Sequence, residues 1–295
     1  MIADVLIPNG GNETTAQRLA RHFKTIDMGR AEVNGEQLKP LYRALRKSAH
    51  TAFDANISLP QLPPASRPVS DRIWGVIVES RKHPSLEYIV NHFSRRLDVG
   101  IQLFHSTLNE TFIKNTSISA LIEQGKVVLT SLRFETLSPV QYNALLLSKV
   151  FWNAVIGRQK ILVFQTDSIL CSNSEHVLDD FLDFDYIGSK WPRERPVGMV
   201  IDGGNGGLSL RDWGKLMECL NRFPASQWPG GEDGYFAFHI DLIADRVGRP
   251  KDCAKFSTQS EFLACSFGAH KISELDEDSL KKFLQYCPEA RKILD

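Results

Sequence analysis

The chain has 295 residues, of which 42% are hydrophobic and 24% charged, the composition of an ordinary water-soluble globular protein. Its 35 basic residues balance its 35 acidic residues, which argues against a basic nucleic-acid-binding surface. No apolar run approaches the roughly 20 residues that a membrane-spanning helix needs. Asp4 and Pro8 lie where a secretion signal would be apolar. We therefore expect a cytoplasmic protein that has no transmembrane segment and binds no nucleic acid.

Residues 1–57 are predicted to form a short α/β extension. The stretch ADVLIPNGG is followed by two stretches with helical spacing, TTAQRLARHF and LKPLYRALRKSAHTAF. A segment of this length has a marginal core on its own, so we expect it to pack on the rest of the protein. Residues 58–72 begin with a proline-rich run that predicts a semi-rigid extended linker. The main domain would then span residues 73–295.

The main domain begins with a regular alternation of apolar strands and amphipathic helices. Strands are predicted at residues 73–80, 99–105, 126–132 and 161–164. Helices are predicted to begin at His83-Pro84-Ser85, to cover residues 117–124, and to run from a Ser138–Gln141 capping box to about Ile156. This order and spacing predict an α/β fold, an open and mostly parallel sheet wound by helices.

Ligands of such sheets bind beyond the carboxyl ends of the strands. Two polar stretches follow predicted strands at this edge. Glu79-Ser80-Arg81 comes after the first strand, and Gln165-Thr166-Asp167-Ser168 comes after the fourth. A carboxylate, Asp167, placed just beyond the apolar run 161–164 therefore predicts a ligand-binding site there.

Three further stretches have a composition that suggests a site, namely DGGNGGLSLR at 202–211, WPGGEDG at 228–234 and SFGAHK at 266–271. Taken singly, each of these features has an ordinary structural explanation. Asp167 could cap a turn, the glycines could form a flexible loop, Glu232-Asp233 could be a solvated turn, and His270 could be structural. No Rossmann first strand precedes the glycines and no P-loop lysine follows them, so they do not indicate a phosphate loop.

The order of the stretches is more specific than any one of them. The sequence resembles glycosyltransferases of the GT-A fold, and most closely a bacterial and fungal group of unassigned specificity. The resemblance covers about residues 73–271 and rests on VIVESRKHPSLEYIVNHF, SPVQYNALLLSKVFWNAV, ILVFQTDSILC, FDYIGSKW, GNGGLSLR, GGEDGYF and FGAHK. It implies a Rossmann-like nucleotide-binding half, an acceptor half, and transfer of a sugar from a nucleotide-diphosphate sugar to a hydroxyl group.

Departure of a nucleoside diphosphate places negative charge on its phosphates, which a hard divalent cation such as Mn²⁺ or Mg²⁺ offsets. The resemblance implies Asp167 and His270 as metal ligands. GT-A enzymes usually carry Asp-x-Asp, whereas this chain has Gln165-Thr166-Asp167. The neutral Gln165 adds no anionic charge, although its amide can bond a ribose hydroxyl. The metal requirement therefore stays open, and Lys271 or Arg211 would carry the phosphate charge if no metal bound.

The resemblance also implies roles in catalysis and donor binding. Asp233 matches the base of GGED-type enzymes, Glu232 would contact a sugar, and inversion of the anomeric centre is favoured over retention. Trp191 and Trp228 could be platforms for sugar rings or half-buried structural residues. The residues expected to bind the donor are Glu79, Arg81, Asn143, Lys149, Gln165, Thr166, Asp167, Gly206, Gly207 and Lys271.

UDP is the first choice of donor nucleotide and GDP the second, and the acceptor is a carbohydrate or another hydroxyl compound. One alternative is a nucleotidyltransferase or other sugar-nucleotide enzyme, which normally has a Gly-rich basic loop where residues 79–83 contain no glycine. Another is a non-catalytic carbohydrate-binding protein. The enzyme could work beside a membrane. The sequence leaves open the oligomeric state and the role of residues 1–57.

The five cysteines are scattered and form no CxxC pair. We expect them to be buried or free thiols in a reducing compartment, in agreement with a cytoplasmic location.

Overall fold

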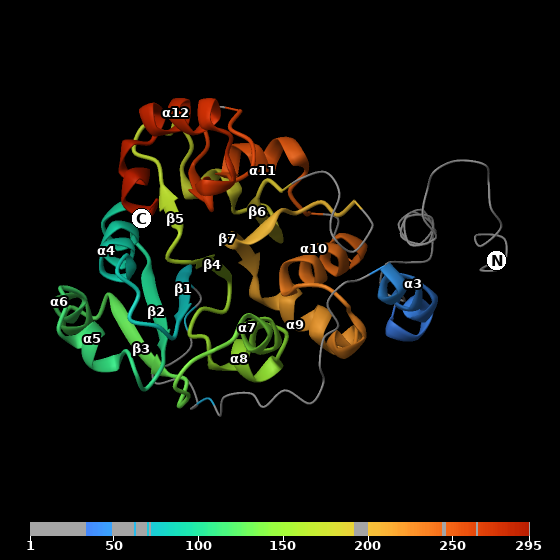
Figure 1. Ribbon diagram of the computed structural model, residues 1–295. Coiled ribbons are helices and arrows are strands. Elements are labelled where there is room, and N and C mark those ends of the chain that lie inside the picture. The colour runs from blue at the N-terminus through green and yellow to red at the C-terminus, as the bar shows by residue number, and fades with distance from the viewer. Residues whose placement is uncertain are drawn as a thin grey trace.

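The computed structural model describes residues 34–48, 62, 70, 72–191, 200–243, 246–263 and 265–294 (Figure 1). The elements predicted before residue 34 and most of the predicted linker lie outside these residues. Of the N-terminal extension, the helix α3 (Gly35–Ser48) is described. No helix within the described ranges is long and apolar enough to cross a membrane.

The centre of the fold is a six-stranded sheet with the order β3-β2-β1-β4-β7-β6. The strands are β1 (Trp74–Glu79), β2 (Gly100–His105), β3 (Val127–Ser131), β4 (Lys160–Phe164), β6 (Tyr186–Ser189) and β7 (Asn205–Asp212). The strands β1 to β4 run parallel, and β7 is antiparallel to both of its neighbours. The predicted fold class, an open and mostly parallel α/β sheet, is confirmed. Since β7 reverses direction, β6 again runs parallel to β4, and its carboxyl end lies at the same edge.

A second, three-stranded sheet continues from this edge. It contains β5 (Ser168–Leu170), β8 (Ser257–Thr258) and β9 (Gly268–His270) in the order β5-β9-β8. The strand β5 is antiparallel to β9, with Ser168 opposite His270. The residues Gln165-Thr166-Asp167 are the short turn between β4 and β5, so they link the two sheets.

Helices cover the large sheet on both faces (Figure 1). Alternate residues of β1 enter different cores, because Val76 and Val78 pack with α7 to α10 while Ile77 packs with α4 and α12. The helices are α4 (Leu86–Arg96), α5 (Glu110–Lys114), α6 (Ile118–Glu123), α7 (Pro139–Leu146), α8 (Lys149–Ala154), α9 (Trp213–Arg222), α10 (Glu232–Ile243), α11 (Pro250–Phe256) and α12 (Glu277–Tyr286). Short 3-10 turns occupy Leu178–Phe181, Ala225–Gln227, Ile272–Glu274 and Pro288–Ile293.

The single helix predicted from Ser138 to about Ile156 is wrong, because the chain breaks between α7 and α8. The predicted capping box at Ser138 and Gln141 is present at the start of α7. Ser148 then has an extended backbone, and its side chain accepts a hydrogen bond from the backbone N–H of Val150. This second N-cap starts a new helix. The apolar pattern continues through Ser148 and therefore does not reveal the break.

The helix α3 packs on the main domain, as expected for the extension. Leu38, Leu41 and Leu45 are wholly buried in the core that α9 and α10 share. The Tyr42 hydroxyl lies 2.8 Å from Nε2 of His239, which belongs to α10. The boundaries predicted at residues 57 and 72 lie outside the described residues.

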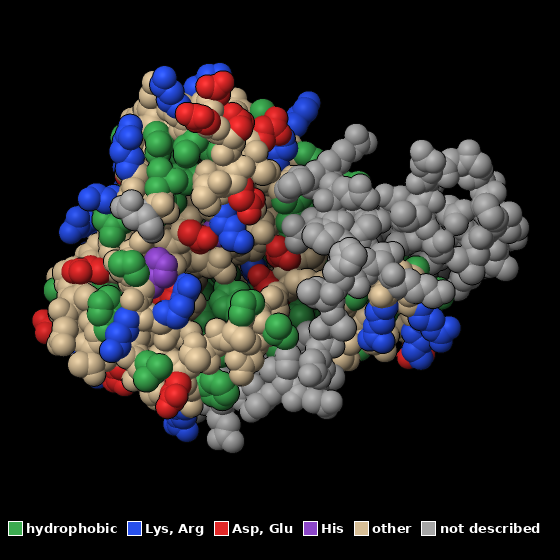
Figure 2. Space-filling view, viewed as in Figure 1, with side chains coloured by type: hydrophobic (Ala, Val, Ile, Leu, Met, Phe, Trp, Pro, Cys, Tyr) green, Lys and Arg blue, Asp and Glu red, His purple; other side chains and the backbone are tan. Residues whose placement is uncertain are grey.

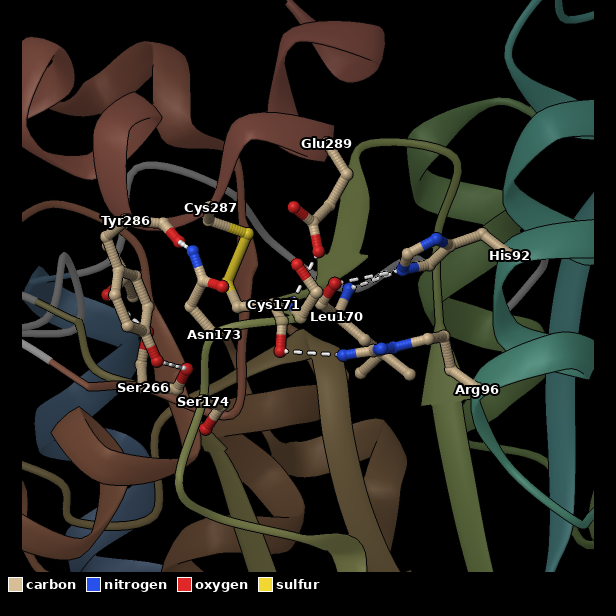
Figure 3. The surroundings of a disulfide bond; sticks show 12 residues. His92, Arg96, Leu170, Cys171, Asn173, Ser174, Ser266, Tyr286, Cys287 and Glu289 are labelled. Carbon is tan, nitrogen blue, oxygen red and sulfur yellow. Dashed lines mark hydrogen bonds between the residues drawn. A yellow bond between two sulfur atoms is a disulfide. The ribbon is translucent and has the colours of Figure 1, made fainter.

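Cys171 and Cys287 form a disulfide, which contradicts the expectation that all five cysteines are unpaired thiols (Figure 3). The bond joins the end of β5 to the residue after α12. Arg96 of α4 donates to the Cys171 carbonyl at 3.0 Å, so three elements meet there. Cys219 and Cys253 are buried thiols and Cys265 is an exposed one. The cysteine pattern therefore gives no support to a reducing compartment, and the cytoplasmic location stays a prediction.

The buried His239 predicts a pH dependence of stability. Burial lowers the pKa of His239 to about 3, whereas an unfolded histidine titrates near pH 6.5. Below pH 6.5 the unfolded chain therefore takes up a proton that the folded chain does not, and stability is lost as the pH falls. The contribution is up to about 1.4 kcal/mol per pH unit until the folded pKa is reached.

We expect urea midpoints measured from pH 7 to pH 4 to fall less steeply for His239→Gln than for the unchanged protein. Tyr42→Phe is the matched control, since it removes the hydrogen bond to His239 and leaves the titrating ring. It should lower stability by about 1 kcal/mol at every pH and keep the slope. Equal slopes for His239→Gln and the unchanged protein would contradict the assignment.

Candidate active site

Polar residues from β1 and from the turn after β4 line a cavity of about 510 Å³ at the carboxyl edge of the sheet. Figure 2 shows acidic, basic and histidine side chains gathered near the middle of the face of the molecule that is turned to the viewer. The lining residues include the predicted Glu79, Arg81, Gln165, Thr166 and Asp167, together with His83, Ser138 and Tyr142. The structure thus brings together the two polar stretches that the sequence places after the first and fourth strands.

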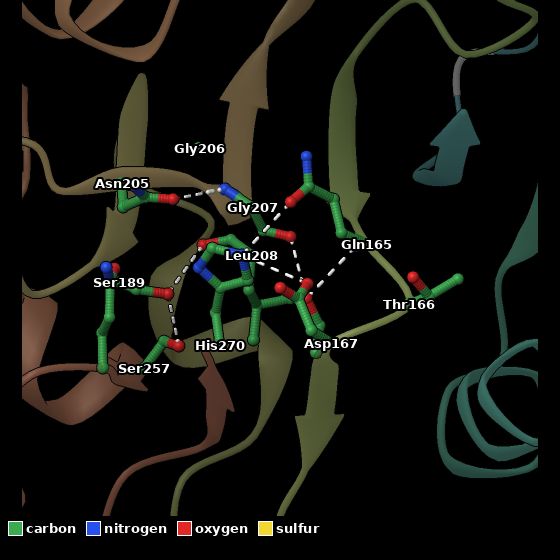
Figure 4. Close-up of polar contacts among 12 residues, drawn as sticks. Gln165, Thr166, Asp167, Ser189, Asn205, Gly206, Gly207, Leu208, Ser257 and His270 are labelled. Carbon is green, nitrogen blue, oxygen red and sulfur yellow. Dashed lines mark hydrogen bonds and ion pairs between the residues drawn. The ribbon is translucent and has the colours of Figure 1, made fainter. Parts of the chain in front are cut away.

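Asp167, Gln165 and His270 converge on one point (Figure 4). His270 Nε2 lies 3.3 Å from Asp167 Oδ1 and 3.2 Å from Gln165 Oε1. His270 is 1% exposed, whereas the Asp167 side chain is 37% exposed. The pairing of β5 with β9 produces this contact, since Asp167 directly precedes β5 and His270 ends β9. Lys271 is exposed, and its backbone N–H donates to the Asp167 carbonyl at 3.2 Å.

The charge of Asp167 is stabilised despite partial burial. Burial raises the pKa of the Asp167 carboxyl, but its contact with His270 and the nearby Lys271 outweigh this effect, so the pKa lies below its ordinary value. Among the described residues, Asp167 Oδ1 and His270 Nδ1 are buried and make no hydrogen bond of normal geometry. Such atoms usually have a partner, so Oδ1 is well placed to accept a further ligand.

The chemistry of these three side chains fits a hard divalent cation. A carboxylate oxygen, an amide oxygen and an imidazole nitrogen are donors that Mn²⁺ accepts. No group of three or more His, Cys, Asp or Glu side chains able to hold a metal occurs in the described part of the chain. A cation held by Asp167 and His270 would therefore take its other ligands from Gln165, water or the donor phosphates.

Two glycines of β7 separate this cluster from Asp233. A Cβ built at Gly207 would lie 2.0 Å from His270 Nε2, and one built at Gly206 would lie 3.1 Å from the Cβ of Asp233. A flexible loop was one explanation of the glycines in the stretch 202–211, but Gly206 and Gly207 belong to β7 and make room for side chains of the protein itself. The start of β7 thus lies between His270 and Asp233, and on the Asp233 side Arg211 Nη2 and Glu232 Oε1 are also close to Gly206, each 2.5 Å from the built Cβ.

Asp233 and Glu232 form the first turn of α10. Both oxygens of Glu232 pair with Arg211, at 2.6 Å to Nη1 and 3.1 Å to Nη2. Arg211 has no exposed surface, and it also donates to the Gly206 carbonyl at 3.2 Å. Asp233 is nearly buried, and its Oδ1 accepts from the Gly234 N–H at 2.7 Å. The structure thus gives Glu232 a buried partner, and its contact with a sugar stays a prediction.

The loop after β1 is held rigidly. Glu79 pairs with Arg81 through two contacts, at 2.9 Å to Nε and 2.8 Å to Nη2. Asn109 donates to the carbonyls of both Glu79 and Arg81, and Ser106 donates to the Ser80 carbonyl. Sequence analysis missed Asn109 and Ser106, which follow the strand β2 and therefore lie at the same edge. The polar pair Ser106 and Asn109 directly after that apolar strand was the available signal.

The remaining predicted residues lie in varied places. Asn143 accepts a hydrogen bond from the Glu232 backbone N–H at 2.9 Å, so it supports the start of α10. Lys149 is exposed at the start of α8 and is not a lining residue of either described cavity. Trp228 is 1% exposed and stacks on Phe238, which leaves no ring face for a sugar. Trp191 lines a second cavity.

Comparison with known proteins gives a family match over part of the chain. The family described as Protein of unknown function (DUF5672) matches residues 127–271, just under half of the chain. The matched segment includes Asp167, Asp233 and His270 and excludes β1. No curated protein shows a significant sequence match.

Three solved structures illustrate the likeness of fold. TarS of S. aureus has a TM-score of 0.40 and 14% identity, covering 59% of this chain and 34% of TarS. The apo-form glycosyltransferase GlyE of Streptococcus pneumoniae TIGR4 has a TM-score of 0.44 and 12% identity, covering 76% of this chain and 61% of GlyE. TarS 1–349 in complex with UDP-GlcNAc has a TM-score of 0.37 and 12% identity, covering 58% of this chain and 53% of the TarS 1–349 chain. The chain spans about a third of TarS and less than two thirds of GlyE, and likeness at this level supports no inference about activity.

Gly207→Ala tests the close approach of β7 to His270. The added Cβ would force the imidazole away from its position, so we expect a loss of about 1–3 kcal/mol in stability. Gly234→Ala in α10 is the matched control, because its Cβ would meet other side chains only at ordinary contact distances, 3.4 Å or more. It should be neutral or stabilise by up to about 1 kcal/mol. Chemical denaturation measures both, and equal stabilities of the two variants would disprove the predicted clash.

Proposed function

We propose that this chain is a glycosyltransferase that moves a sugar from a nucleotide-diphosphate sugar to a hydroxyl group of an acceptor. The observation that carries the proposal is the meeting of three separate features at one edge of the sheet. Asp167 and His270 lie beside a cavity of about 510 Å³, and the strand carrying Gly206 and Gly207 lies between His270 and Asp233. Cation ligands, a nearby carboxylate base and space for a nucleotide are the parts that this reaction needs.

The donor would bind in the cavity between β1 and β4. The buried carboxylate of Glu79 can accept hydrogen bonds from hydroxyl or N–H groups of the nucleoside, and Arg81 fixes its orientation. A Mn²⁺ or Mg²⁺ ion held by Asp167 and His270 would supply positive charge to the diphosphate. The exposed Lys271, next to His270, adds a further positive charge at this end of the cavity. We propose UDP as the nucleotide, with GDP as the second choice.

Asp233 is the proposed base. It accepts the proton of the acceptor hydroxyl while the hydroxyl oxygen bonds to the anomeric carbon, and the bond from that carbon to the diphosphate oxygen breaks. The nucleoside diphosphate leaves with the electron pair. Attack from the face opposite the leaving group inverts the anomeric centre. Glu232, locked to the buried Arg211, holds the helix turn that carries Asp233.

Nucleotide binding is tested by thermal shift with UDP, GDP, CMP and ADP, each with and without Mn²⁺. One diphosphate at 100 times its Kd should stabilise the protein by about 2.7 kcal/mol. Asp167→Asn should remove the part of the shift that depends on Mn²⁺. A shift only with triphosphates would favour a nucleotidyltransferase instead, and no shift with any nucleotide would rule out both activities.

Asp233→Asn should keep the nucleotide shift and reduce transfer about 10²–10⁴-fold, because the amide cannot accept the acceptor proton. The measurement is release of nucleoside diphosphate from a sugar nucleotide. The sugar nucleotide chosen carries the same nucleoside as the diphosphate that gave a thermal shift. Asp179→Asn, which changes an exposed carboxylate on a surface 3-10 turn, is the control and should keep the original rate. Transfer by Asp233→Asn at nearly the original rate would show that Asp233 is not the base.

A further inference from the structure

A second cavity, of about 370 Å³, lies at the carboxyl end of β6. Its lining includes the largely apolar side chains of Trp191, Val200, Ile201, Pro250 and Cys253. None of these residues belongs to the cavity between β1 and β4. The proposed catalytic steps use none of them.

The position of this second cavity relates it to Asp233. The strand β6 runs parallel to β4 with β7 between them, so the two cavities occupy the same edge on opposite sides of β7. Two strand spacings put the backbones of β4 and β6 about 10 Å apart. Ile201 Cδ1 would lie 3.7 Å from a Cβ built at Gly234, the residue after Asp233. Ile201, which lines the second cavity, therefore also packs against the helix turn that carries the proposed base.

The charges around the second cavity are already paired. Lys190 forms an ion pair with Glu261, and Asp202 pairs with Arg249 at 2.7 Å. A phosphate or carboxylate in the cavity would thus have to displace one of these partners. The remaining polar side chain among the described lining residues is Ser260, apart from the thiol of Cys253.

The thiol of Cys253 adds to the apolar character. Its Sγ donates to the Gly248 carbonyl at 3.4 Å, and burial raises its pKa to about 12, so it stays neutral at physiological pH. Val200 is 46% exposed where it lines the cavity, so apolar surface is available to a ligand. Covering such surface is favourable only for a ligand with an apolar part of its own.

We propose that the second cavity is an acceptor subsite that binds an uncharged apolar group, one ring or a short alkyl chain, attached to the hydroxyl-bearing part of the acceptor. This inference rests on the proposed function. The volume is near the lower end of the range for small-molecule sites, which suits one such group and not a long lipid. Hydroxyl groups set against the exposed Val200 side chain would find no hydrogen-bond partner there, whereas an apolar group would cover it favourably. The acceptor is therefore a glycoside or alcohol with an apolar carrier.

The test compares phenyl β-glucoside with methyl β-glucoside as probes, using saturation-transfer NMR on the whole chain to measure Kd. We expect the phenyl compound to bind at least tenfold more tightly. Val200→Glu should abolish this preference, since the carboxylate would lie against the ring. Val200 is exposed, so the variant should fold. Cys253→Phe is a second change, which fills the cavity and should abolish the same preference. Val177→Glu, at an exposed valine that lines neither described cavity, should keep the preference.

Equal binding of the two probes, or no binding of either, would overturn the inference. So would an unchanged preference in Val200→Glu. The nucleotide thermal shift, measured on the same samples, separates the two proposals. Probe preference without any nucleotide shift would overturn the glycosyltransferase proposal and leave an apolar binding site, whereas a nucleotide shift without probe preference would overturn the acceptor subsite alone.

Discussion

The site depends on one short ladder, the antiparallel pairing of β5 with β9. It sets Ser168 opposite His270 and so holds Asp167 beside an imidazole that is distant in the sequence. Ser168 Oγ also donates to the Gly207 carbonyl at 2.9 Å, which ties β5 to β7. The Cys171–Cys287 disulfide fixes the other end of β5 to the C-terminal helix. A three-residue strand is too short to be stable alone, so these cross-links are what keep the proposed metal ligands in register.

The buried pair of Arg211 and Glu232 plays the corresponding part for the proposed base. Burial alone would lower the pKa of Arg211, but the charge of Glu232 raises it above the ordinary value, so the guanidinium stays charged. Removing one member of such a pair leaves an uncompensated buried charge, at a cost of about 3–5 kcal/mol. An apolar pair could fill the same space without a loss of folding stability. We therefore explain the ion pair by the way it orients the first turn of α10. Arg211 lies near the end of β7, and its guanidinium bonds both the Gly206 carbonyl near the start of that strand and Glu232 at the start of α10.

Local sequence patterns predicted the parts of this structure that depend on local physics. Apolar runs marked β1 to β4, and the polar residues after two of them, Glu79 and Asp167, do line one cavity. The missed features depend on contacts between distant segments. Nothing near Glu232 indicates that Arg211 takes both of its oxygens, and nothing in the cysteine spacing indicates that Cys171 meets Cys287. Gly206 and Gly207 were predicted to bind the donor, and the structure adds that the nearest atoms at Gly207 belong to His270.

The helix α10 connects the N-terminal helix α3 to the proposed active site. All of its residues are buried, including Glu232 and Asp233 at its start. A helix that is buried on every side needs packing partners all around. The described part of the N-terminal extension supplies one, because α3 contributes Leu38, Leu41 and Leu45 to this core and bonds His239 through Tyr42. The helix α3 thus packs against the helix whose first turn carries the proposed base.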